Sequence, residues 1–269
     1  MTVTSSTQFV TSRDGTRIAY DRIGDGPALV IVGGATSTRG VMGGTPGALG
    51  EHFTVYSFDR RGRGDSGDTA PYAVEREIED IAALIEAAGG SARLFGHSSG
   101  AVLALRAAAA GLPVERLAVY EPPFIVDDSR PPVPDDYVAT LDRLIAEGKR
   151  EEAVIYFMTV AVGIPEAFVE EMRQGPYWQH SIDLAHTLAY DSRVMGDTMS
   201  GKPLDPEPWN RITVPTLVMA GGASEPFMRA GAQALVSHLP RGEYKVLEGQ
   251  DHGPADEVLV PELVRFLTA

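Results

Sequence analysis

The chain has 269 residues, of which 22% are charged and 43% hydrophobic, and its formal net charge at pH 7 is −14. This length suits one α/β domain with a large core and leaves room for an insertion. The strong negative charge argues against nucleic acid or an anionic membrane surface as a partner. Because the sequence contains no cysteine, disulfides, thiolate metal sites and a cysteine nucleophile are excluded.

The first residues, Met1–Ser6, lack the basic and apolar segments of a secretory signal peptide. No apolar run in the sequence is long enough to span a bilayer. We therefore expect a cytoplasmic protein that does not bind membranes. For the oligomeric state, a monomer and a homodimer both stay open.

Apolar runs that predict strands alternate with amphipathic runs that predict helices. A hairpin is expected first, with strands at Phe9–Ser12 and Arg17–Arg22 joined by the turn pair Asp14-Gly15. Further strands are expected at Ala28–Val32, Phe53–Phe58, Ala92–Phe95, Leu117–Tyr120, Thr216–Ala220 and Tyr244–Leu247. Helices are expected at Glu75–Ala88, Ala101–Ala110, Phe227–Leu239 and Val258–Leu267. This alternation predicts a mostly parallel sheet flanked by helices.

The interval Ile125–Pro208 interrupts the alternation. Prolines cluster at both of its ends, and helices are expected between them at Tyr137–Ala146 and Glu151–Val162. Its many methionine and aromatic side chains would serve either a small core of the insertion itself or the inner face of a lid over an apolar pocket. We predict a core domain of residues 1–124 and 209–269 and a helical cap of residues 125–208.

A Gly-x-Ser-x-Gly pentapeptide, Gly96 to Gly100, lies between a predicted strand and a predicted helix. In this context the motif marks a turn so sharp that only glycine fits two residues before and after the serine. The turn exposes the hydroxyl of Ser98 beside the first amides of the helix, where a developing oxyanion can be stabilised. Ser98 is therefore the candidate nucleophile.

A serine nucleophile needs a general base at neutral pH. Among six histidines, His252 is the candidate, because it follows the last predicted strand and precedes the last helix. His97 adjoins the nucleophile, where packing or support is expected of it. His180 and His186 lie in the cap and are candidates for substrate contact. Six residues apart on a helix, they do not share a face, so no metal site is predicted.

These motifs together resemble α/β-hydrolase-fold proteins with a helical cap, over essentially the whole chain. The segment 58–66 is similar to the family's Asp-x-Arg-Gly-x-Gly-x-Ser loop after the fourth strand, for which a structural role is expected. The resemblance implies an α/β-hydrolase fold with an inserted cap and gives His252 the position of the catalytic histidine. It also implies an oxyanion hole made by the N–H groups of Ala35 and Ser99, although Gly33-Gly34 replaces the family's usual His-Gly.

The acid of the triad has two candidates. The family usually carries an aspartate about three residues beyond Gly221, where this chain has Ser224, followed by Glu225. Some members, including certain haloalkane dehalogenases, place a glutamate after the sixth strand, where this chain has Glu121. A carboxylate at the end of an apolar strand is costly unless a partner such as histidine relieves it. We prefer Glu121, with Glu225 as the alternative and an incomplete triad as the third possibility.

A serine nucleophile with a histidine base and an oxyanion hole suits acyl transfer. The sequence therefore predicts an esterase-like serine hydrolase that needs no cofactor and cleaves a carboxylic ester, thioester or lactone of a small apolar substrate. The alternative is a non-hydrolytic member of the fold, such as a lyase, a cyclase or a small-molecule receptor that uses the same pocket. The residues expected to line this pocket are Gly34, His97, Phe124, Met158, Trp178 and His186.

Overall fold

The computed structural model describes residues 7–41 and 43–269, so the segment Met1–Ser6 that bears on localisation lies outside the described residues. Its strands are β1 (Gln8–Thr11), β2 (Arg17–Ile23), β3 (Ala28–Val32), β4 (Thr54–Phe58), β5 (Ala92–His97), β6 (Val114–Tyr120), β7 (Thr216–Gly221) and β8 (Gly242–Leu247). They form one eight-stranded sheet in the order β1-β2-β4-β3-β5-β6-β7-β8. The β1–β2 and β2–β4 pairs are antiparallel, and β3 to β8 run parallel with β4. The expected mostly parallel sheet is confirmed.

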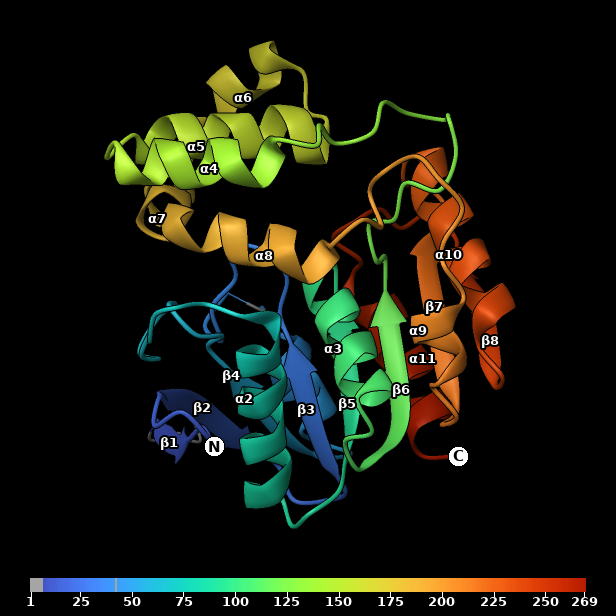
Figure 1. Ribbon diagram of the computed structural model, residues 1–269. Coiled ribbons are helices and arrows are strands. Elements are labelled where there is room, and N and C mark those ends of the chain that lie inside the picture. The colour runs from blue at the N-terminus through green and yellow to red at the C-terminus, as the bar shows by residue number, and fades with distance from the viewer. Residues whose placement is uncertain (1–6, 42) are drawn as a thin grey trace.

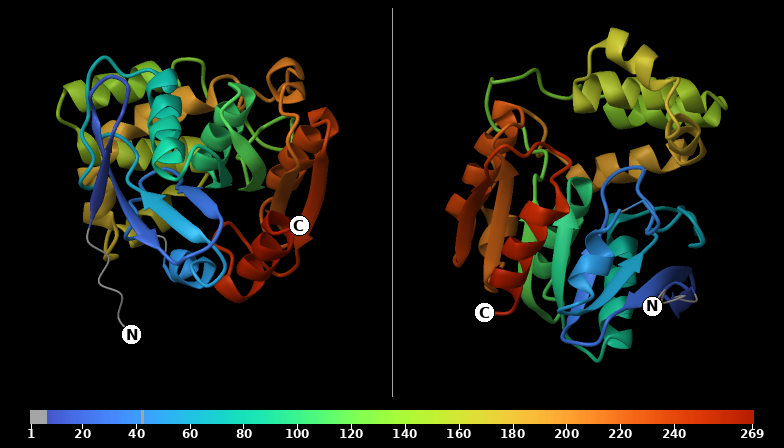
Figure 2. Two further views of the ribbon diagram at one scale, coloured as in Figure 1. Left: turned by 90° about the horizontal axis from the view of Figure 1, so that it is seen from below. Right: turned by 180° about the vertical axis from the view of Figure 1, so that it is seen from behind.

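Helices cover both faces of the sheet (Figure 1). They are α1 (Thr45–Leu49), α2 (Val74–Ala87), α3 (Ser99–Ala109), α9 (Glu207–Asn210), α10 (Pro226–His238) and α11 (Asp256–Leu267). Alternate residues of β3 point to opposite faces, so Val30 packs with α2 and α3, and Leu29 packs with α1 and α11. The back view in Figure 2 shows α11 on the face opposite α2 and α3. Burial on both faces explains why the central strands are apolar throughout.

Five helices lie beyond the carboxyl ends of the strands, at the top of Figure 1. They are α4 (Tyr137–Ala146), α5 (Arg150–Tyr156), α6 (Glu166–Met172), α7 (Trp178–Asp183) and α8 (Leu188–Met195). A π-helical turn at Phe157–Val162 continues α5, where the sequence predicted a single α-helix. Leu141, Val154 and Trp178 belong to a hydrophobic cluster of these helices, separate from the two clusters of the sheet. None of the described helices is both long and apolar enough to cross a bilayer.

The end of α8 and the segment after it pack against the sheet domain. Val194, Met195 and Leu204 belong to the same hydrophobic cluster as α2 and α3. The two connections between sheet and upper helices are also joined, because Ile125 N–H donates to the Thr198 carbonyl at 2.9 Å. The cap predicted from the sequence, residues 125–208, therefore contains residues that pack with the sheet domain as well as residues that pack with the upper helices.

Candidate active site

Ser98 lies in the sharp turn between β5 and α3, with φ 57° and ψ −127°. A Cβ on Gly96 would lie 2.6 Å from the Ala101 Cα, and one on Gly100 would lie 2.2 Å from the Val32 carbonyl oxygen. Only glycine fits at both positions, as the motif predicted. A positive φ at serine is a strained conformation that persists only where the surrounding structure enforces it. The turn places Ser98 at the carboxyl edge of the sheet.

Glu121 follows β6, at the same edge, and is completely buried. Its Oε2 lies 2.6 Å from His252 Nδ1, and its Oε1 accepts a 2.7 Å hydrogen bond from Gly221 N–H. Burial alone raises the pKa of this carboxyl, but the hydrogen bonds from His252 and Gly221 outweigh burial and hold the pKa below its usual value. A carboxylate facing Nδ1 fixes the proton on that nitrogen, which leaves Nε2 as a base.

The alternative acid, Glu225, does not contact the histidine. It is exposed and lies immediately before α10. Among the described residues, Glu121 is the carboxylate that His252 contacts. Ser224 occupies the position where the family usually has an aspartate. The structure thus brings His252 to the carboxylate that the sequence analysis preferred.

His252 and Ser98 line the same cavity. Within the described part of the chain, no hydrogen bond joins the Ser98 hydroxyl to the His252 ring, and such contacts often close only when substrate binds. His97 supports the loop that carries His252, because its Nε2 donates to the His252 carbonyl at 2.8 Å. Burial, and then the neighbouring His252, lower the pKa of His97 to about 4, so this ring is neutral at pH 7.

Ala35 and Ser99 line the same cavity as Ser98. Ser99 is the first residue of α3, so its N–H has no acceptor within the helix. The segment before Ala35 approaches the nucleophile closely, since a Cβ on Gly34 would lie 2.9 Å from the Ser98 Cβ. This arrangement can offer two backbone N–H groups to an oxygen bound at Ser98.

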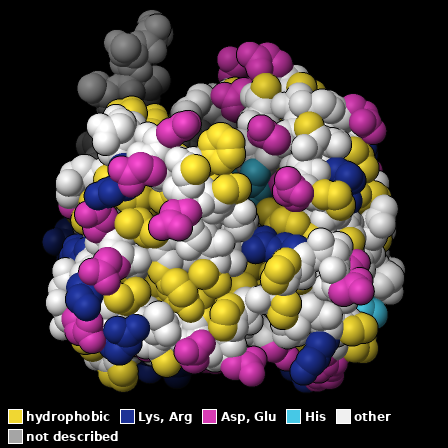
Figure 3. Space-filling model, turned by 90° about the horizontal axis from the view of Figure 1, so that it is seen from above, with side chains coloured by type: hydrophobic (Ala, Val, Ile, Leu, Met, Phe, Trp, Pro, Cys, Tyr) yellow, Lys and Arg dark blue, Asp and Glu magenta, His cyan; other side chains and the backbone are white. Residues whose placement is uncertain are grey.

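The cavity has a volume of about 810 Å³. Apolar side chains line it from both parts of the molecule, among them Phe157 and Ile164 from the upper helices and Phe227 from α10. Carboxylates also line it, and those that reach solvent are Asp135, Asp197, Glu225 and Asp251. Lysine and arginine are absent from the described lining. Figure 3 looks down on this face, where hydrophobic side chains lie around the hollows, with acidic and basic side chains among them.

None of the six residues predicted to line the pocket is among the residues that line this cavity. Gly34 approaches Ser98 closely, and His97 hydrogen-bonds the His252 carbonyl. Phe124 is fully buried and packs against the ring of Trp209, with 5.6 Å between the ring centroids. For Gly34 and Phe124 the sequence identified the neighbourhood of the site but not the cavity wall, whereas the supporting contact expected of His97 is present.

The other three corrections concern the upper helices. Met158 packs with the hydrophobic cluster there. Trp178 is buried in the same cluster, and its Nε1 donates to Glu151 at 3.0 Å. His186 Nε2 hydrogen-bonds the Gly62 carbonyl at 2.9 Å. Phe157, the residue before Met158, lines the cavity instead. Which of two neighbouring residues faces the cavity depends on the rotational phase of the helix.

The described residues include no group of three or more histidine, aspartate and glutamate side chains arranged to hold a metal ion.

Comparison with known proteins identifies the family. A model of the "Alpha/beta hydrolase family" matches residues 29–264. The chain belongs to the α/β hydrolase family. An α/β hydrolase from Sphaerobacter thermophilus has a solved structure with 56% identity, a TM-score of 0.89, and coverage of 96% of this chain and 99% of that one.

Two further relatives carry the names of different hydrolases. An N-formylmaleamate deformylase from Pseudomonas putida is 42% identical over 117 residues, which are 42% of this chain and 44% of the deformylase. The chain thus matches less than half of that relative's length. A pimeloyl-[acyl-carrier protein] methyl ester esterase from Xanthomonas campestris is 28% identical, with 93% of this chain and 98% of the esterase covered. The relatives' names therefore describe hydrolases.

Proposed function

We propose that the protein is an esterase-like serine hydrolase with the triad Ser98, His252 and Glu121. The observation that carries this proposal is the buried Glu121 carboxylate, 2.6 Å from His252 Nδ1, at the wall of the cavity that Ser98 also lines. A fully buried carboxylate is costly, and its pairing with a histidine that lines the same cavity as a strained serine has a direct use in acyl transfer.

In the proposed mechanism, Ser98 Oγ attacks the substrate carbonyl carbon while His252 Nε2 takes the hydroxyl proton. Glu121 keeps the Nδ1–H tautomer and stabilises the imidazolium that forms. The N–H groups of Ala35 and Ser99 stabilise the oxyanion. His252 then gives the proton to the leaving alcohol, which departs as the acyl-enzyme forms. Water, activated by His252, attacks the acyl-enzyme, and the acid and free Ser98 result.

The substrate we propose is a small, neutral and largely apolar ester, thioester or lactone. The apolar lining supports the apolar part, and the carboxylates at the mouth would repel an anionic acyl group. The family and the hydrolase relatives support acyl transfer in general. We also propose that residues 125–208 act as the cap that closes this pocket over the core of residues 1–124 and 209–269.

Hydrolysis of p-nitrophenyl butyrate by the Ser98→Ala variant tests the proposal. Removing the nucleophile should lower kcat by on the order of 10⁴ or more, with the circular dichroism spectrum unchanged. Ser200→Ala is a matched control, because Ser200 lines the same cavity and has no role in the mechanism. It should keep kcat within about threefold. Substantial activity in Ser98→Ala would reject the proposal.

A further inference from the structure

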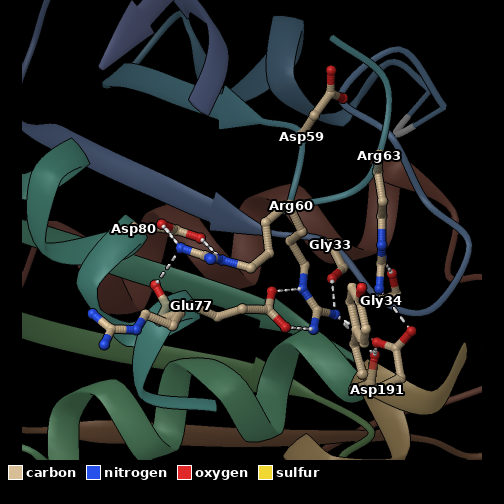
Figure 4. A network of polar contacts seen from close by, with 12 residues as sticks. Gly33, Gly34, Asp59, Arg60, Arg63, Glu77, Asp80 and Asp191 are labelled. Carbon is tan, nitrogen blue, oxygen red and sulfur yellow. Dashed lines mark hydrogen bonds and ion pairs between the residues drawn. The ribbon is translucent and has the colours of Figure 1, made fainter. Parts of the chain in front are cut away.

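A cluster of buried charges joins the loop after β4 to helix α8 (Figure 4). Arg60 makes two hydrogen bonds of 2.6 and 2.7 Å to the Glu77 carboxylate. Asp191 of α8 accepts from Arg60 Nη1 at 2.6 Å and from Arg63 Nη2, also at 2.6 Å. The four side chains are all at most 4% exposed. Because Glu77 is engaged with Arg60, Asp191 is the carboxylate that balances Arg63.

Arg63 also binds the backbone of the proposed oxyanion hole. Its Nη1 donates to the Gly34 carbonyl oxygen at 2.6 Å. The Gly34 carbonyl and the Ala35 N–H belong to one peptide unit, and in a trans peptide these two groups point in opposite directions. The Gly34 carbonyl oxygen also accepts from Ser37 Oγ at 2.7 Å and from Ser37 N–H at 3.3 Å. Arg63 and Ser37 together fix the carbonyl on this side, and Arg63 brings the only charge among these donors. The Ala35 N–H is thereby directed to the other side, and Ala35 lines the cavity.

The positive charge should also strengthen this donor. A cation bound to a carbonyl oxygen draws electron density from the peptide, which makes the N–H of the same unit a better hydrogen-bond donor. The effect is largest where water is excluded, and both Arg63 and Gly34 are buried. Arg63 can thus act on the oxyanion without touching the substrate.

The second proposed donor is connected to the same carboxylate. Ser99 Oγ donates to Asp191 Oδ1 at 2.7 Å, and Arg60 Nη1 lies 3.3 Å from the same hydroxyl. Arg60 Nη1 also lies 3.4 Å from the Gly33 carbonyl oxygen. The two segments that carry the Ala35 and Ser99 N–H groups are therefore held together by one aspartate of α8.

We propose that Arg63, held by Asp191, is a positioning residue of the oxyanion hole, so that helix α8 contributes to the chemical step as well as to the pocket. This inference rests on the proposed serine hydrolase function. It predicts a defect in stabilising the oxyanion, not in binding the substrate.

A buried arginine could instead serve only to anchor α8, and Arg61 provides the control for that role. Arg61 belongs to the same loop, is fully buried, and makes hydrogen bonds of 2.9 and 2.7 Å to the Asp80 carboxylate. Its other acceptors are Asp14 and the Arg76 carbonyl. None of its described contacts is with Gly33, Gly34 or Ser99, so its loss should destabilise the loop without affecting the oxyanion hole.

The test compares Arg63→Gln with Arg61→Gln in the full-length protein. Two inhibitors separate oxyanion stabilisation from binding: benzyl trifluoromethyl ketone and benzyl methyl ketone. Ser98 Oγ adds to the activated carbonyl carbon of the first, its proton goes to His252, and the carbonyl oxygen becomes the oxyanion. The methyl ketone has a similar shape but binds without forming this adduct.

Arg63→Gln should lower kcat for p-nitrophenyl butyrate by on the order of 10², the usual loss when one oxyanion-hole donor is disturbed. Its affinity for the trifluoromethyl ketone should fall by a similar factor. KM and the affinity for the methyl ketone should stay within about threefold. Arg61→Gln should stay within about threefold in all four measurements, although its melting temperature falls.

The proposal is overturned if Arg63→Gln behaves like Arg61→Gln, or if the affinities for the two ketones fall equally. Should Arg63→Gln not fold, Arg63→Lys takes its place. The lysine keeps the charge beside Asp191 but lacks the fork that reaches two acceptors, so its trifluoromethyl ketone affinity should fall at least about tenfold. An unchanged affinity in Arg63→Lys overturns the proposal. Wild-type protein without Ser98-dependent hydrolysis would instead reject the proposed function, and this inference with it.

Discussion

The sheet domain and the helices above it differ in how tightly they hold their residues and in what they contribute to the site. The sheet domain holds Ser98 at φ 57° and Glu121 at φ 48°, two strained conformations that need neighbours on every side. The upper helices are short and leave large side chains in solvent, such as Phe168 at 58% and Tyr177 at 68% exposure. The sheet domain thus carries the proposed reactive groups and part of the pocket wall, whereas the upper helices add only wall, such as Phe157. Asp191 is the exception, because it lies on α8 and yet binds Arg63 and Ser99 of the sheet domain.

After loss of the proposed nucleophile, loss of the proposed triad acid should have the largest effect on activity in the sheet domain. Glu121→Gln keeps the shape but removes the charge that stabilises the imidazolium and fixes its tautomer, so kcat should fall by roughly 10² to 10⁴. Glu225→Gln, at the mouth of the same cavity, should cost less than about tenfold. Steady-state kinetics with p-nitrophenyl butyrate measure both. A larger loss in Glu225→Gln would move the acid to that residue.

The negative charge at the mouth of the cavity should favour neutral esters over anionic esters. p-Nitrophenyl butyrate should be hydrolysed with a kcat/KM on the order of 30-fold above that of the p-nitrophenyl monoester of succinic acid, because the carboxylates at the mouth repel the added charge. The difference should shrink in the double variant Asp197→Asn, Glu225→Gln. Equal kcat/KM values for the two esters would contradict a pocket selective for neutral substrates.

The walls supplied by the upper helices should affect binding more than chemistry. Phe157→Ala removes part of the apolar lining and should raise KM for a bulky ester, p-nitrophenyl phenylbutyrate, about tenfold, with little change for p-nitrophenyl acetate. Phe168→Ala is the matched control, since Phe168 is exposed and does not line the cavity. If Phe157→Ala lowered kcat for both esters alike, the wall would be part of the reactive machinery.

The last effect concerns stability under acid and not activity. The pKa of His97 is about 4 in the folded protein, below its usual 6.5, so between these values the unfolded chain binds a proton that the folded chain does not. Wild-type protein should therefore lose stability as the pH falls from 6.5 to 4, and His97→Gln should lose about 3 kcal/mol less. Urea unfolding at several pH values measures this, with His52→Gln as a surface control. Identical pH dependence in wild type and His97→Gln would contradict a neutral His97.

The sequence predicts features that are determined locally. The elbow around Ser98 is specified by glycines two residues away, and the buried parallel strands are specified by continuous apolar runs. Glu121 could be preferred because a carboxylate at the end of such a strand needs a partner. These signals lie within a few residues of the feature they predict.

Features that depend on contacts distant in the sequence could not be predicted. Arg63 and Asp191 are 128 residues apart in the chain, and neither position has a local pattern that points to the other. The prediction of the pocket lining failed for a related reason. Met158 and Trp178 were chosen by residue type, but helix phase and packing decide which side chain faces the cavity. The π-helical turn at Phe157–Val162 shifts that phase in a way that the sequence pattern does not reveal.

The most direct test of the central claim is covalent labelling with a fluorophosphonate, followed by mass spectrometry of the digested protein. The probe reacts with a serine whose hydroxyl is activated by a base and whose oxyanion is stabilised. We predict one adduct, on the peptide that contains Ser98, with much slower labelling in His252→Ala and Glu121→Gln. Absence of an adduct on Ser98 in the folded wild-type protein, or equally fast labelling without His252, would contradict the account.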